Sequence, residues 1–178
     1  FVMSVNPTSS AWLFGGRNRP AARWRLFCLP HAGGGASFFR QWGHYFPEEI
    51  EVCLVQLPGR ENRIREVPRQ HFPSLVAELA QALAPYLDKP YAFFGHSMGA
   101  LLSYGLTHHL RDQGLPLPAQ LFVSAYRAPH LPAPEAWHDL PDAQLVEKLI
   151  GLSSTNQEIL ANEELRSFLL PVVRADFA

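Results

Sequence analysis

The feature that most constrains this chain of 178 residues is a serine between two closely spaced glycines, in the segment Gly95-His96-Ser97-Met98-Gly99. An apolar run typical of a buried strand, Tyr91 to Phe94, precedes it, and an apolar helical pattern follows it. Glycines two residues before and after the serine allow a strand and a helix to pass close together at a sharp turn. Such a turn exposes the serine hydroxyl at the carboxyl end of the strand. Ser97 is therefore a candidate catalytic nucleophile.

Strands and helices alternate along the first 128 residues. Apolar runs predict short buried strands at 25–29, 50–56, 91–94 and 121–124. Helical patterns cover 36–46, the leucines that follow Pro73, and 98–111, with Gly114 as a C-terminal cap. Pro85 is expected to end or kink the second of these helices. This alternation predicts a mostly parallel sheet with helices on both faces, and the serine turn indicates an α/β-hydrolase fold.

The pattern changes after Ala128, where three prolines over residues 129–134 interrupt regular structure. Asp139 and Pro141 indicate a helix start, and Asn162 is a plausible cap for a further helix. No new strand pattern follows, so we predict a helical lid over the active site; helices that simply cover the sheet are the alternative. The predicted units are an N-terminal extension at 1–24, a hydrolase core at 25–128 and a helical lid at 129–178.

A serine hydroxyl attacks a carbonyl poorly until a base removes its proton, and the oxyanion that forms needs positioned donors. The amide of Met98, the residue after the nucleophile, is the first expected donor. The second is expected from the loop after the first predicted strand, where Gly33-Gly34-Gly35 gives the backbone freedom. Ala32 is the candidate donor in that loop. The alternative is that the glycines form only a flexible turn.

Composition narrows the class of protein. The formal net charge of −1 argues against general nucleic-acid binding. Basic residues nevertheless concentrate in residues 1–70, with nine arginines and five glutamates, against six basic and eleven acidic residues in 71–178. No apolar stretch reaches the roughly 18 residues of a membrane span, and the N-terminus lacks a signal pattern. Cys28 and Cys53 are expected to be buried free thiols of a cytoplasmic protein; a disulfide or a thiol nucleophile stays an alternative.

Four segments together resemble type II thioesterases, the stand-alone editing hydrolases of polyketide and nonribosomal peptide assembly lines. These segments are Leu29 to Gly34, Gln56 to Glu61, Phe94 to Ala100 and Val173 to Phe177, in the expected order over about residues 25 to 178. The resemblance implies hydrolysis of acyl groups from the phosphopantetheine arm of an acyl or peptidyl carrier protein. It further implies an acyl-serine at Ser97, an oxyanion hole of Met98 and Ala32, and a helical lid before the last strands.

The resemblance is incomplete at the C-terminal side. Type II thioesterases continue with a catalytic Asp after a later strand and a catalytic His near the C-terminus, and no segment here matches either. We expect truncation of a longer protein, whose sheet here has four strands and an exposed edge. The histidines offer no good replacement for the base. We expect the His96 ring to point away from Ser97 and the His31 ring to shape the pocket. His108 and His109 are expected on a helix that leads away from Ser97. His130 and His138 follow the fourth predicted strand and are weak candidates for the base. Asp176 matches the lid segment rather than the catalytic Asp.

A dense basic stretch at Arg60, Arg63, Arg65 and Arg69 follows the second predicted strand. Because carrier proteins are usually acidic, we hypothesise that Arg60, Arg63 and Arg65, or the arginines at 17, 19, 23 and 25, contact the carrier. Solvated surface arginines are the simpler alternative. We expect a monomer without a metal or nucleotide cofactor, since no Cys/His cluster has ligand spacing. The alternative functions are a medium-chain fatty acyl thioesterase or carboxylesterase, and a non-catalytic carrier-binding protein.

Overall fold

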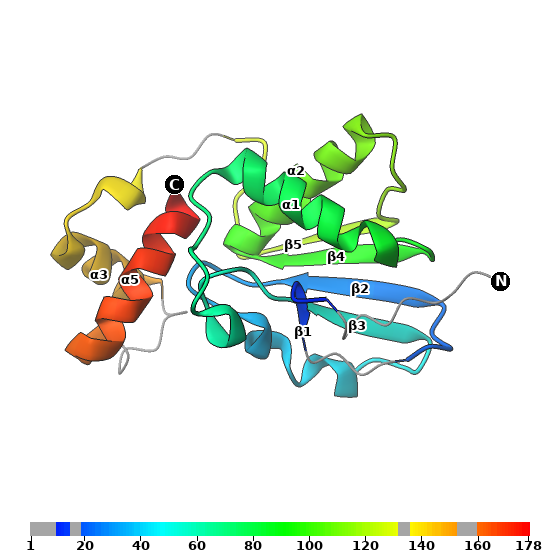
Figure 1. Ribbon diagram of the computed structural model, residues 1–178, viewed down its shortest axis with the longest axis horizontal. Helices are drawn as coiled ribbons and strands as arrows, with labels where there is room; N and C mark the ends of the chain where they lie inside the picture. Colours follow the sequence, from blue (N-terminus) through cyan, green and yellow to red (C-terminus); the bar gives the residue numbers. More distant parts are fainter. Residues whose placement is uncertain (1–9, 15–18, 132–135, 153–159) are drawn as a thin grey trace.

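The computed structural model describes residues 10–14, 19–131, 136–152 and 160–178. A five-stranded sheet in the order β1-β3-β2-β4-β5 forms its centre (Figure 1). The strands are β1 (Leu13–Phe14), β2 (Trp24–Leu29), β3 (Ile50–Val55), β4 (Tyr91–His96) and β5 (Gln120–Ser124). All neighbours are parallel except β1, which pairs antiparallel with β3. The predicted mostly parallel sheet is therefore confirmed.

The register brings the carboxyl ends of the central strands to one edge of the sheet. Leu29 pairs with Gly95, and His96 pairs with Ser124. The loop after β2 and the turn after β4 consequently begin side by side. Parallel α/β sheets place their ligand sites at this edge, where the loops that follow the strands meet.

One face of the sheet is covered by α1 (Phe72–Leu83) and α2 (Met98–Asp112). The leucines at 75, 79 and 83 are buried, which confirms the predicted face of α1. Pro85 has the predicted effect, because α1 ends at Leu83 and continues only as a 3₁₀ turn over Ala84–Tyr86. Gly114 follows α2 with φ 67°, as a C-terminal cap requires.

The predicted helix over 36–46 is wrong: two 3₁₀ helices, Ala36–Phe39 and Trp42–His44, occupy this segment. The rings of Phe39 and Trp42 both pack on Phe94 of β4, at centroid distances of 5.8 and 4.6 Å. Their spacing of three residues matches the 3₁₀ repeat, and Gly43 is a poor former of a longer helix. The aromatic packing therefore decides the local conformation.

The strand β1 lies inside the segment predicted as an N-terminal extension. Leu13 pairs with Val55 and is buried against the core on the α1 side of the sheet. Two residues are too few to produce a periodic apolar pattern, so the sequence gives no signal for this strand. At the opposite side of the sheet β5 is an edge strand, and its Phe122 and Val123 are exposed by 49% and 40%.

Two helices, α3 (Asp142–Gly151) and α5 (Glu163–Phe177), form a separate group at the end of the sheet that carries the loop after β2 (Figure 1). Leu145, Leu149, Leu170 and Val173 form a core of their own within this group. The Asn162 side chain accepts from the amide of Leu165 at 3.1 Å, which confirms the predicted cap. The predicted start at Asp139 is displaced, because Pro141 is the N-cap of α3. In the described ranges no helix is long and apolar enough to cross a membrane.

Candidate active site

Ser97 lies at the turn between β4 and α2, in a backbone conformation that L-residues rarely adopt. Its φ is 53° and its ψ is −118°, a strained geometry typical of functional turns. The amide of Ser97 donates to the carbonyl of Ser124 at 2.8 Å, which ties the turn to the end of β5. A Cβ built on Gly95 would lie 2.1 Å from the carbonyl oxygen of Gly99. Only glycine fits there, as the spacing of the two glycines predicts.

The two predicted oxyanion donors are both available. Met98 is the first residue of α2, and the first amides of a helix have no acceptor within the helix. Ala32 lies in the loop between β2 and the first 3₁₀ helix. Within the described part of the chain, no backbone carbonyl or side chain accepts a hydrogen bond from either amide. Met98 follows Ser97 directly, and the start of the loop that carries Ala32 packs against Gly99. Free backbone amides are what a tetrahedral oxyanion needs.

The glycine loop, Gly33-Gly34-Gly35, is followed by two residues that hydrogen-bond to the segment after β3. The side chain of Gln56 accepts from the amide of Ala36 at 2.8 Å and donates to the carbonyl of Arg60 at 2.9 Å. The Glu61 carboxylate accepts from the hydroxyl of Ser37 at 2.5 Å. The segment Leu29 to Gly34 thus forms the loop, and the segment Gln56 to Glu61 supports it.

Asp176 is a site residue whose role the sequence did not predict. It lies in the last turn of α5, and its carboxylate accepts from the amide of Gly33 at 2.7 Å. Two further bonds come from the Arg60 guanidinium, at 2.8 and 2.7 Å, in a bidentate pair. The pair joins residues 116 positions apart in the chain, a contact that no local pattern signals. Helix α5 is thereby attached to the loop after β2.

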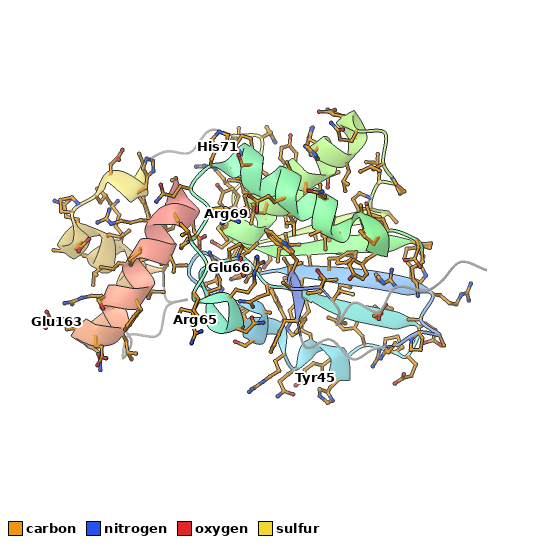
Figure 2. The ribbon with its side chains drawn as sticks, in the orientation of Figure 1. Tyr45, Arg65, Glu66, Arg69, His71 and Glu163 are labelled. Atoms are coloured by element: carbon orange, nitrogen blue, oxygen red, sulfur yellow. The ribbon has the colours of Figure 1, made fainter. Side chains whose placement is uncertain are left out.

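The hypothesis that Arg60 and Arg63 contact a carrier needs correction. The Arg60 side chain is only 6% exposed and pairs with Asp176. Arg63 is 7% exposed, pairs with Glu66 and lies 4.3 Å from the Trp12 ring centroid. Arg65, by contrast, is exposed. Figure 2 shows Arg65, Glu66 and Arg69 along the segment that leads to α1.

Of the other predicted contacts, Arg19 and Arg25 are also buried. The guanidinium of Arg19 donates to four carbonyls between Gly43 and Ile50, and Arg25 pairs with Glu51 at 2.7 Å. Arg23 is exposed, and Arg17 lies outside the described residues. Most of these arginines therefore hold the fold rather than form a docking surface.

The rings of His31, in the loop after β2, and His96, directly before Ser97, make an edge-to-face contact with centroids 6.0 Å apart. Burial lowers the pKa of both imidazoles, and His96 and Arg60 lower that of His31 further. His96 Nδ1 is within 3.0 Å of the Ser124 hydroxyl. The His31 ring occupies the space beside Gly34, where a Cβ would lie 2.7 Å from it. The His31 ring therefore shapes the loop, while the His96 ring is bonded to the end of β5.

The remaining histidines give Ser97 no base in the described part of the chain. His138 is bonded to the carbonyl of Phe177 at 2.9 Å within the lid. His108 packs on Tyr104 of α2, and His130 is exposed. No described side chain is hydrogen-bonded to the Ser97 hydroxyl. In these same residues, no group of three His, Cys, Asp or Glu side chains is placed to hold a metal ion.

Comparison with known proteins agrees with the strand, turn and helix around Ser97. Residues 24–178 match the thioesterase domain family. The gramicidin S biosynthesis protein GrsT of Aneurinibacillus migulanus is 45% identical, over the whole chain and 68% of its own length. The thioesterase RedJ of the prodiginine pathway in Streptomyces coelicolor has a TM-score of 0.83 at 43% identity, over 90% of this chain and 63% of its own.

The type II thioesterase BorB of the borrelidin biosynthetic cluster is a further structural relative. Its TM-score is 0.77 at 34% identity, over 93% of this chain and 68% of its own. The chain spans about two thirds of the length of these relatives. It belongs to the thioesterase family, with relatives among the type II thioesterases of biosynthetic pathways.

Proposed function

We propose that the protein hydrolyses acyl thioesters through an acyl-serine intermediate at Ser97. The observation that carries this proposal is the strained Ser97 backbone at the turn between β4 and α2, together with the free amides of Met98 and Ala32. The Ser97 oxygen bonds to the thioester carbon while a general base, which is none of the described histidines, takes its proton, and the carbonyl π electrons become the oxyanion. The C–S bond then breaks, the thiolate leaves as a protonated thiol, and water repeats the attack to release the acid and free Ser97.

The substrate class we propose is an acyl group on the phosphopantetheine arm of an acyl or peptidyl carrier protein. Support comes from the relatives, whose names assign them to gramicidin S, prodiginine and borrelidin biosynthesis. Removal of wrong or stalled acyl groups, or release of a product, fits such a pathway. Arg65 is the carrier contact that we retain, because it is exposed and basic. We further propose a cytoplasmic monomer that needs no metal or nucleotide.

The test is acylation of the full-length protein by an acyl-pantetheinyl carrier, followed by intact mass. Ser97→Ala is expected to abolish the mass increase of one acyl group and to lower turnover by about 10⁴-fold or more. Hydrolysis of free esters in preference to carrier-bound thioesters would support a carboxylesterase or fatty acyl thioesterase instead. Carrier binding without hydrolysis, equal in both forms, would support the non-catalytic alternative.

A further inference from the structure

The hydrogen bond between α5 and the glycine loop suggests a role for the lid in the chemistry itself. We propose that Asp176 is a positioning residue for the oxyanion hole, which holds the Ala32–Gly33 peptide so that the Ala32 amide faces the carbonyl oxygen of the acyl group on Ser97. This inference rests on the proposed acyl transfer at Ser97. It adds a residue that acts on the oxyanion hole through the glycine loop.

The carboxylate of Asp176 uses both oxygens. Oδ2 accepts from the amide of Gly33 at 2.7 Å and from Arg60 Nη1 at 2.8 Å, while Oδ1 accepts from Arg60 Nη2 at 2.7 Å. The exposed fractions of the two side chains are 1% for Asp176 and 6% for Arg60. Hydrogen bonds to a buried, paired carboxylate are short and strong, so the Gly33 amide is held in one direction.

The fixed direction of the Gly33 amide restricts the backbone conformation of Ala32. The amide of Gly33 belongs to the peptide group that follows Ala32, so fixing it restricts the ψ angle of Ala32. A second bond, from the amide of Gly34 to the carbonyl of His31 at 3.0 Å, closes the turn. Gly33 has φ 74°, a region in which glycine is free to move unless something holds it. Because the Gly33 amide is committed to Asp176, the Ala32 amide is the one left for the oxyanion.

The lid helix also fills the space above this loop. A Cβ built on Gly33 would lie 2.8 Å from Val173 Cγ2 and 3.0 Å from Leu169 Cδ1. Side chains of α5 thus press on the loop while Asp176 holds it. The oxyanion loop adopts its observed geometry with α5 in place, so the position of the lid and the readiness of the site are linked.

The alternative hypothesis, that the Arg60–Asp176 ion pair serves only stability, predicts a different result. Replacing a buried ion pair by apolar side chains of similar size is often neutral for stability, whereas removing one partner is costly. The double variant Arg60→Met/Asp176→Leu is therefore expected to fold but to leave the Gly33 amide without its acceptor. If Asp176 acted only in stability, this variant would recover full function as well.

The experiment compares two ligands on the full-length protein. An acyl-pantetheine trifluoromethyl ketone adds to Ser97 and places an oxyanion in the hole, while the matching thioether binds without one. We expect the double variant to bind the ketone about tenfold to a hundredfold more weakly and the thioether within twofold of wild type. Asp176→Asn, which keeps an oxygen for the Gly33 amide, is expected to lie between wild type and the double variant.

The matched control is Arg174→Met on the same helix. The Arg174 guanidinium pairs with Asp142 and with the carbonyl of His138, both of which precede α5 in the chain. This variant should bind both ligands as wild type does. An equal loss for both ligands in the double variant, or an unchanged ketone affinity, overturns the inference.

A second readout does not depend on catalysis. In protein labelled with ¹⁵N-glycine, the Gly33 amide proton should resonate downfield because of its charged acceptor, and it should move upfield in the double variant. An unchanged resonance overturns the inference even if ketone binding falls. If wild type itself forms no ketone adduct at Ser97, the proposed function fails instead, so the two failures are distinguishable.

Discussion

Gly99 and the carbonyl group of Leu29 are in direct contact: a Cβ built on Gly99 would lie 2.1 Å from the Leu29 oxygen. This contact presses the first turn of α2 against the end of β2. Ser97 is the N-cap of α2, and the loop that contains Ala32 begins just after β2. This close approach of two backbones therefore brings the turn at Ser97 next to the start of the loop that contains Ala32.

We predict that Gly99→Ala destabilises the protein by about 3 kcal/mol and abolishes acylation of Ser97. In a helix, alanine is normally preferred to glycine by roughly 0.5–1 kcal/mol. The expected loss of stability therefore comes from the steric clash alone. Urea unfolding measures the change. Gly151→Ala is the matched control, since no atom lies within 4 Å of its added Cβ. Equal stability of both variants would contradict the packing argument.

Arg63→Glu should destabilise the fold, by about 3 kcal/mol, rather than affect docking. The change places a carboxylate beside Glu66 and removes the cation from the Trp12 ring and the Gln56 carbonyl. Thermal unfolding measures the loss. A variant as stable as wild type would show that the buried position of Arg63 is not required.

Arg65→Glu should leave stability within about 0.5 kcal/mol of wild type, because the side chain is exposed. Reversal of its charge is expected to lower kcat/KM for carrier-bound thioesters about threefold to tenfold, mainly through association, and to spare small thioesters. Steady-state kinetics on both substrates at low salt tests this. Loss on both substrates alike would remove Arg65 from the docking surface.

The sequence predicted what local patterns encode. The four longer strands, the sharp turn at Ser97, the cap at Asn162 and the end of α1 before Pro85 all follow from periodicity and from single residues with special backbone preferences. The contacts that define the oxyanion loop are not local. Gly33 and Asp176 are bonded across 143 positions of the sequence. Arg60 was predicted as a surface cation, but its side chain is buried. The sequence does not show which distant residue a charged side chain will pair with, so the tertiary structure is needed to identify such clusters.

The two cysteines should be inert in the native protein. Burial raises the pKa of the Cys28 thiol well above its usual value, and burial and Glu51 raise that of Cys53. Thiolates react with Ellman's reagent and thiols do not, so we expect no labelling at pH 8 over several minutes. Both thiols should react once denaturant is added. Rapid labelling of the native protein would contradict the observed burial.

Stability is expected to fall as the pH drops below about 6.5, the pKa of an unfolded histidine. Burial lowers the pKa of His31 and of His96 in the folded protein, so the unfolded chain binds more protons than the folded one in this window. The free energy of unfolding then decreases with falling pH until the folded imidazoles are also protonated. Urea unfolding at pH 7.5 and pH 5.5 measures the slope. The double variant His31→Gln/His96→Gln should flatten it, and an unchanged slope would assign the pH dependence to other groups.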